Sequence, residues 1–119
     1  MYDPKYFALS EFDSPDFPAS GLNMDATFLQ MLDSARDKAG IPFKITSGYR
    51  TESHNAKVGG VANSSHLKGY AADIACTSGA DRWIIIDALI KSGFSRIGVA
   101  KTFIHVDNDP DKSSAIWTY

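Results

Sequence analysis

The chain has 119 residues, of which 44% are hydrophobic and 22% charged, and we expect residues 1–119 to form one globular domain with a single core. The formal net charge of −2, with both signs spread along the chain, argues against a nucleic-acid partner, and no apolar stretch approaches the length of a membrane-spanning helix. Cys76 is the only cysteine, which excludes an internal disulfide and a cysteine-rich zinc site, so a metal site would have to use His, Asp or Glu.

Residues 1–22 are rich in Pro, Asp and Ser and predict an irregular N-terminal lead with one short turn at residues 9–12. The lead lacks the basic head and apolar run of a secretory signal peptide, so we expect a protein made in the cytoplasm. We expect its aromatic side chains to pin the lead to the domain: Tyr2, Tyr6, Phe7, Phe12 and Phe17.

Residues 24–39 predict an amphipathic helix, with Asn23 as its N-cap and Gly40 just past its end. The β-rich run at 43–50 predicts a strand that enters a tight bend at Ser47 and Gly48. The inward side chains of the helix are expected to be Phe28, Leu29, Met31, Leu32 and Ala35.

A short helix at 51–57, capped by Thr51, and a loop rich in Gly, Asn and Ser are predicted next. Residues 70–76 predict a strand, and two short β-rich runs at 95–100 and 102–107 predict a hairpin. Between them, residues 80–92 predict a second helix with these side chains inward: Trp83, Ile86, Leu89 and Ile90. This order favours an α+β fold, with a small antiparallel or mixed sheet and helices packed on one side.

Three residues are candidate metal ligands: His66, Asp73 and His105. Catalytic zinc sites use three protein ligands and leave a fourth position open. Asp73 and His105 each lie between apolar residues in a predicted strand, so they would share one face if their strands are neighbours. The spacing alone leaves other roles open: a packed histidine at 105, an Asp73 ion pair with Lys68, and a solvated loop residue at 66.

Three motifs in this order resemble the zinc D-alanyl-D-alanine carboxypeptidase family, within the LAS group of murein peptidases that also includes hedgehog-type domains. They are SGYR at 47–50, SSHLKGYAADI at 64–74 and FIHVD at 103–107, and the resemblance covers roughly residues 7–107. The resemblance implies a hedgehog/DD-peptidase-like fold and a Zn²⁺ ion held by the three candidate ligands.

The resemblance also implies a role for Arg50, the arginine of SGYR, in holding the scissile carbonyl or a substrate carboxylate. A guanidinium suits either partner because it offers fixed bidentate donors, although an ion pair with Glu52 or another acid is the structural alternative. Ser65 and Tyr49 are the other candidate substrate-binding residues.

Thr102 departs from the family pattern, because many members carry Asp or Glu there as the general base. Asp107 lies two residues after His105 and shares its face of a strand. We weigh two roles for Asp107, as the general base or as the carboxylate that orients His105, and prefer the second.

The function expected from this resemblance is a zinc metallopeptidase that hydrolyses a peptide bond in peptidoglycan, as a D-Ala-D-Ala carboxypeptidase or a murein endopeptidase. Its partners would be peptidoglycan peptide stems, without nucleic acid or membrane insertion, and the protein would be a monomer. A phage lysis enzyme that reaches the cell wall through a holin fits this expectation. The alternatives are a catalytically weakened zinc-containing module that binds murein or protein, favoured by Thr102 and Phe103, and a metal-free structural domain.

Overall fold

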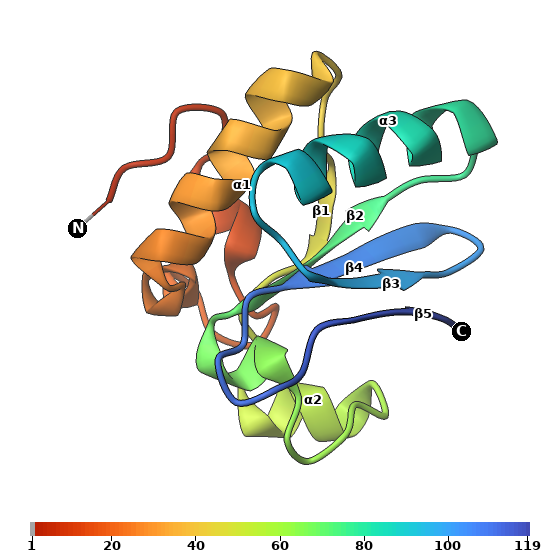
Figure 1. The fold of residues 1–119 in the computed structure, drawn as a ribbon. Helices are drawn as coiled ribbons and strands as arrows, with labels where there is room; N and C mark the ends of the chain where they lie inside the picture. Colours follow the sequence, from red (N-terminus) through yellow and green to blue (C-terminus); the bar gives the residue numbers. More distant parts are fainter. Residues whose placement is uncertain (1) are drawn as a thin grey trace.

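The computed structural model describes residues 2–119 and has the expected α+β fold (Figure 1). Three α-helices, three short 3₁₀-helices (η) and five strands follow one another along the chain. In chain order they are η1 (Leu9–Phe12), η2 (Ser20–Asn23), α1 (Ala26–Ala39), β1 (Ile45–Ser47), α2 (Glu52–Lys57), η3 (Ser65–Lys68), β2 (Ala71–Ala75), α3 (Gly79–Lys91), β3 (Arg96–Val99), β4 (Phe103–Asp107) and β5 (Ala115–Thr118).

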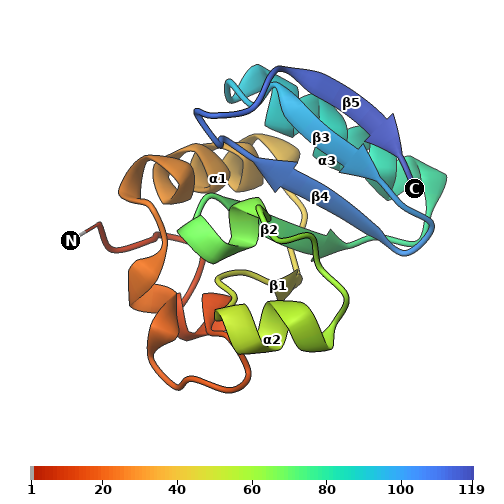
Figure 2. The same ribbon diagram turned by 90° about the horizontal axis from the view of Figure 1, so that it is seen from below.

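The strands form one mixed sheet in the order β1-β2-β4-β3-β5, which Figure 2 shows from the side of α2. Strands β1 to β4 pair antiparallel, and the predicted hairpin of β3 and β4 is confirmed. Strand β5 was not predicted; it pairs parallel with β3 at the edge of the sheet. The C-terminal residues therefore lie beside β3, on the same sheet as the candidate ligands.

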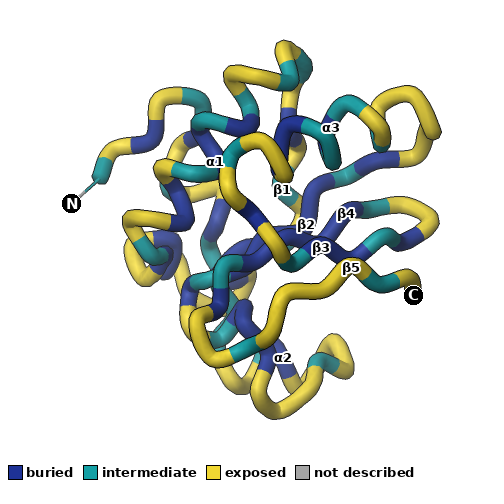
Figure 3. The backbone as a smooth tube through the Cα atoms, viewed as in Figure 1, coloured by how far each residue is buried: buried dark blue, intermediate teal, exposed yellow. Residues whose placement is uncertain are grey.

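The two longer helices, α1 and α3, pack together against one face of the sheet, whereas the short α2 lies on the other side (Figure 1). The central strands β2, β3 and β4 are largely buried, whereas the loop after α2 and strand β5 are among the exposed parts of the chain (Figure 3). The apolar strand residues that contribute to the core beneath the helices are fully buried: Ala72, Ile74, Ile97, Ile104 and Val106.

Helix α1 begins two residues later than predicted. Asp25, not Asn23, is the N-cap, and its carboxylate accepts a hydrogen bond from the Phe28 amide at 2.9 Å. Asn23 is unavailable because it is the last residue of η2. Gly40 ends the helix with a φ of 68°, a left-handed conformation that favours glycine, as predicted.

The inward face of α3 was partly mispredicted. Trp83 is 70% exposed and Ile90 50% exposed, whereas Ile85 and Leu89 are buried. The helix carries three consecutive isoleucines, so apolar residues surround much of its circumference and their spacing does not single out one face. The contact with α1 and the sheet, rather than the local pattern, decides which side chains are buried.

The N-terminal lead is tied to α1 by the buried carboxylate of Asp33, which accepts hydrogen bonds from the Lys5 amide at 2.8 Å and the Tyr6 amide at 3.1 Å. Phe7 and Phe12 join the core, as expected, but Phe17 is 52% exposed and does not belong to the core. Among residues 2–119, no helix is long and apolar enough to span a membrane.

Candidate metal centre

Asp73 on β2 and His105 on β4 are direct register partners in the sheet. Their apolar neighbours face the helices, so both polar side chains point to the opposite face. Ala71 and Ala75, two residues to either side of Asp73, share this face and carry only methyl groups. These small side chains leave room for the Asp73 carboxylate to meet side chains from other elements.

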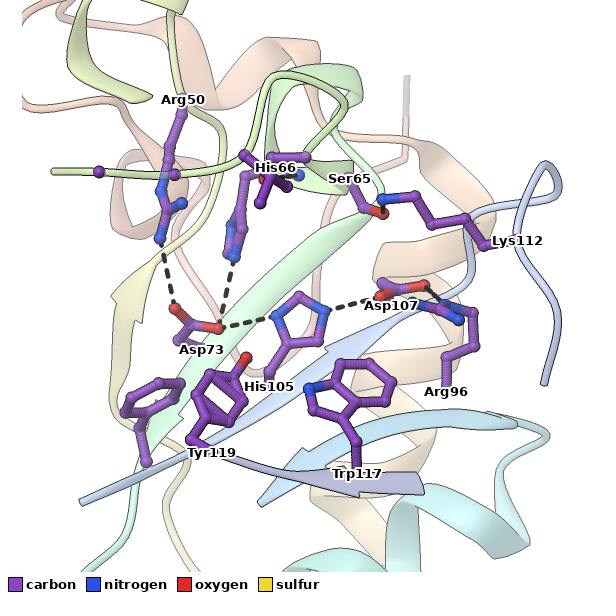
Figure 4. A pocket seen from close by; sticks show the side chains of 15 residues that line it. Arg50, Ser65, His66, Asp73, Arg96, His105, Asp107, Lys112, Trp117 and Tyr119 are labelled. Atoms are coloured by element: carbon purple, nitrogen blue, oxygen red, sulfur yellow. Dashed lines mark hydrogen bonds and ion pairs between the residues drawn. The ribbon is translucent and has the colours of Figure 1, made fainter. Parts of the chain in front are cut away.

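His66 reaches the same point from η3, above the sheet (Figure 4). The Ser64 hydroxyl caps η3, and the His66 carbonyl accepts a hydrogen bond from the Arg50 amide at 3.1 Å. The Nδ1 atom of His66 donates to the Gly48 carbonyl at 2.8 Å, because a carbonyl can only accept. The other ring nitrogen of His66, Nε2, lies 3.4 Å from Asp73 Oδ1.

The three candidate ligands converge on one point. One ligand atom of each of His66, Asp73 and His105 lies within 4.8 Å of the others, and all three residues are buried. Two imidazole nitrogens and one carboxylate oxygen are a donor set that zinc accepts, and a three-residue set leaves a coordination position free. The geometry thus fits the metal that the sequence indicated.

Asp107 holds the far side of the His105 ring. Its Oδ2 atom accepts a hydrogen bond from His105 Nε2 at 2.6 Å, and its Oδ1 atom accepts one from Arg96 Nε at 2.7 Å. Both imidazoles therefore have their distal nitrogen bound to a protein oxygen, which orients the other nitrogen toward Asp73. Such distal contacts are typical of histidines that ligate metal.

The ionisation of these groups follows from their contacts. Burial alone would raise the pKa of Asp73, but hydrogen bonds from His105 and His66 hold it well below its usual range. Burial alone would lower the pKa of His105, but its hydrogen bonds to Asp107 and Asp73 raise it above the ordinary value. Without a metal, the two ring nitrogens of His105 therefore contact one carboxylate each, and a bound cation would take the place of the Nδ1 proton.

A cavity of about 410 Å³ opens above this group. Arg50 lines it and is fixed by Ser47 Oγ at 3.0 Å and Asn55 Oδ1 at 3.3 Å, with Asp73 Oδ2 at 3.5 Å. Of the ion pairs given as the structural alternative for Arg50, the structure has one with Asp73 rather than with Glu52.

Of the two other candidate substrate-binding residues, Ser65 lines the cavity and Tyr49 does not. Ser65 lines the cavity, and its hydroxyl donates to the buried Asp109 at 2.8 Å and accepts from Lys112 at 2.9 Å. Tyr49 packs against the hydrophobic core instead and is not among the residues that line the cavity. Thr102 is exposed in the turn before β4 and also lies outside the cavity lining.

The cavity residues that were not singled out from the sequence include two cations and two aromatic residues: Arg96, Lys112, Trp117 and Tyr119. Arg96 could have been suspected from register, since a β3–β4 hairpin places it opposite Asp107. Lys112, Trp117 and Tyr119 follow β4 in a segment without a clear local pattern, and only the unpredicted pairing of β5 brings that segment to the cavity.

A buried group of two histidines and one aspartate at the base of an open cavity could hold a metal ion and leave a coordination position free, as catalytic zinc sites do. A family model described as Peptidase M15 matches residues 9–107. The chain belongs to this family of zinc D-Ala-D-Ala carboxypeptidase-like enzymes, which confirms the resemblance seen in its motifs and supports a peptidase activity. No curated protein matches the chain.

Proposed function

We propose that the protein is a zinc-dependent peptidase that hydrolyses a peptide bond in the peptide stems of bacterial peptidoglycan. The observation that carries the proposal is the convergence of His66 Nε2, Asp73 Oδ1 and His105 Nδ1 within 4.8 Å at the base of a cavity. The family supports peptidase chemistry, and the donor set fits zinc. A bound Zn²⁺ would supply a Lewis acid and a water whose pKa is lowered to about 7.

Arg50 is the residue we propose to stabilise charge on the substrate. Its contacts with Ser47 and Asn55 fix the guanidinium at the cavity wall, and its side chain is 15% exposed. A preorganised donor placed in this way stabilises an oxyanion that develops on the scissile carbonyl, or binds a neighbouring carboxylate. Ser65 is the second proposed substrate contact, through the lone pair that its bond from Lys112 leaves free.

We assign Asp107 to orienting His105 rather than to proton transfer. Its two oxygens are bound by His105 and Arg96, and the residue is only 1% exposed. Burial would raise the pKa of Asp107, but its bonds with His105 and Arg96 lower it, so it stays ionised and engaged. A general base must reach the proton that it takes, and Asp107 would first have to leave both partners.

A second function is favoured by the same cavity. Among the described residues that line it, Asp73 and Asp107 are the only carboxylates, and neither is free. A zinc-containing module that binds murein peptides without cleaving them would have this composition. Turnover therefore separates the two functions, whereas zinc content does not.

The test is the release of peptides from purified murein sacculi by the zinc-loaded protein, followed by chromatography and mass spectrometry. The proposal predicts release, and the product masses distinguish loss of a terminal D-Ala, cleavage at L-Ala-D-Glu and cleavage of a cross-link. Binding to sacculi without release would establish the binding module, and neither binding nor release would refute both functions. A role in phage lysis is a further part of the proposal, tested by co-expression with a holin and loss of culture turbidity.

A further inference from the structure

Strand β5 lies beyond residues 9–107, the part of the chain that matches the family. It nevertheless continues a row of register partners that crosses the sheet through the candidate metal centre. Asp73 pairs with His105, His105 with Gly98, and Gly98 with Trp117. Trp117 therefore points to the same face of the sheet as the two ligands.

Gly98 is the position that lets β5 approach the centre. A Cβ atom at residue 98 would lie 2.7 Å from Trp117 Nε1 and 2.9 Å from Tyr119 Cε1, too close for either ring to stay in place. Because glycine has no side chain, both rings extend over β3 toward β4. The centroid of the Trp117 ring lies 5.5 Å from that of His105.

Both rings are held in place yet remain accessible. The guanidinium of Arg96 lies 4.9 Å from the Trp117 centroid, and Tyr119 packs edge-on against Phe103 at 5.1 Å. Trp117 is half-buried and Tyr119 is 67% exposed, and both line the cavity. In Figure 4, Arg50 and His66 approach Asp73 from one side, and Tyr119 and Trp117 lie on the other side of the Asp73–His105 pair.

We infer that Trp117 and Tyr119 form an apolar binding wall for the stem peptide next to the scissile bond, which rests on the function proposed above. Rigid aromatic rings with a free face bind apolar groups at a small cost in conformational entropy. The opposite wall carries the cation Arg50, with Lys112 at the rim. The cavity thus selects a peptide with a small apolar side chain at the scissile bond and a carboxylate close by, a description that D-alanine residues of the stem satisfy.

Fluorescence tests this inference directly, because the chain has two tryptophans, Trp83 and Trp117. Trp83 lies on α3 and is 70% exposed, so Trp83→Phe leaves Trp117 as the single indole without disturbing the cavity. The zinc-loaded Trp83→Phe protein is mixed with a synthetic pentapeptide stem ending in D-Ala-D-Ala and followed during the first seconds. The inference predicts a saturable change in emission, and an unchanged emission at saturating peptide would overturn it.

Kinetics on the zinc-loaded protein provide the second test. Trp117→Ala and Tyr119→Ala should each raise KM for the same peptide about five- to tenfold, with zinc content unchanged. Gly98→Ala should act in the same direction, because the added Cβ displaces both rings without removing them. Ile116→Ala is the matched control, since Ile116 lies on the opposite face of β5 and is 62% exposed.

The inference would be contradicted if Trp117→Ala, Tyr119→Ala and Gly98→Ala raised KM no more than Ile116→Ala does. A loss of zinc in parallel with the rise in KM would contradict it as well. The two proposals fail separately. If the wild-type protein cleaves murein but the β5 variants are unaltered, only the binding wall is refuted. If no peptide is cleaved but Trp117 emission responds to the stem peptide, the binding wall stands and the peptidase function is refuted.

Discussion

The Oδ2 atom of Asp107 lies 2.6 Å from the Nε2 atom of His105, and the same carboxylate is held from its other oxygen by Arg96. This contact binds the distal nitrogen of His105 and directs Nδ1 to Asp73, 3.0 Å away. We therefore propose that Asp107, weighed as the general base because residue 102 is a threonine, instead supports His105 as a metal ligand, and several measurable consequences depend on this arrangement.

Asp107→Asn separates the two roles of this carboxylate. If Asp107 orients His105, the substitution lowers zinc affinity about 10- to 100-fold, and hydrolysis recovers at saturating zinc. Zinc affinity is measured by competition with a chelating dye, and Asp111→Asn serves as the control because the Asp111 side chain is 78% exposed. Unchanged zinc affinity, with hydrolysis lost at every zinc concentration, would identify Asp107 as the general base instead.

Arg96→Gln removes the ion-pair partner of a carboxylate that is 1% exposed. Breaking a buried pair from one side leaves an uncompensated charge, so we expect the free energy of unfolding to fall by about 3 kcal/mol. Urea denaturation of the metal-free protein measures this free energy of unfolding. As the control, Lys91→Gln breaks the exposed ion pair with Asp87 and should lower the free energy of unfolding by less than about 0.5 kcal/mol. Equal losses in the two variants would show that the Arg96–Asp107 pair contributes no more than a surface contact.

His66→Ala should abolish both tight zinc binding and hydrolysis of murein, because one of three ligands is lost. His54→Ala is the matched control, since His54 lies on α2 outside the ligand group. Zinc content after dialysis and peptide release are measured on the same preparations. Full activity of the His66→Ala protein on purified murein would refute the mechanism.

The pKa of His105, raised above its model-peptide value of 6.5, gives zinc binding a defined dependence on pH. In the metal-free protein the protonated ring stabilises the fold below pH 6.5, and this contribution is lost as the pH rises through the raised pKa. Zinc must displace the Nδ1 proton, so its affinity increases over the same range. The increase in Tm on adding zinc should therefore be larger at pH 8 than at pH 6, and an increase independent of pH would contradict this assignment.

The candidate ligands could be predicted because strand alternation is a local property. Apolar residues on both sides of Asp73 and of His105 required the polar side chains to face away from the core. Whether their two strands are neighbours was left open, and the pairing of β2 with β4 brings the two side chains together. The convergence of His66 was available only through its resemblance to a family motif, because η3 has no periodic pattern of its own.

Strand β5 could not be predicted for the opposite reason. Three of its four residues are exposed, so the segment lacks the alternation of a half-buried strand, and its parallel pairing with β3 depends on a contact distant in sequence. Trp117 was therefore not singled out from the sequence. The outward position of Trp83 was missed because the apolar residues of α3 surround much of its circumference and give only a weak directional signal.

The most direct test of the metal centre is a crystal structure of protein purified without chelator, with diffraction data recorded on both sides of the zinc absorption edge. An anomalous peak bonded to His66 Nε2, His105 Nδ1 and a carboxylate oxygen of Asp73, at about 2.0–2.2 Å from each, is the expected result. The absence of a peak at this position, or a zinc ion held by other residues, would contradict the account.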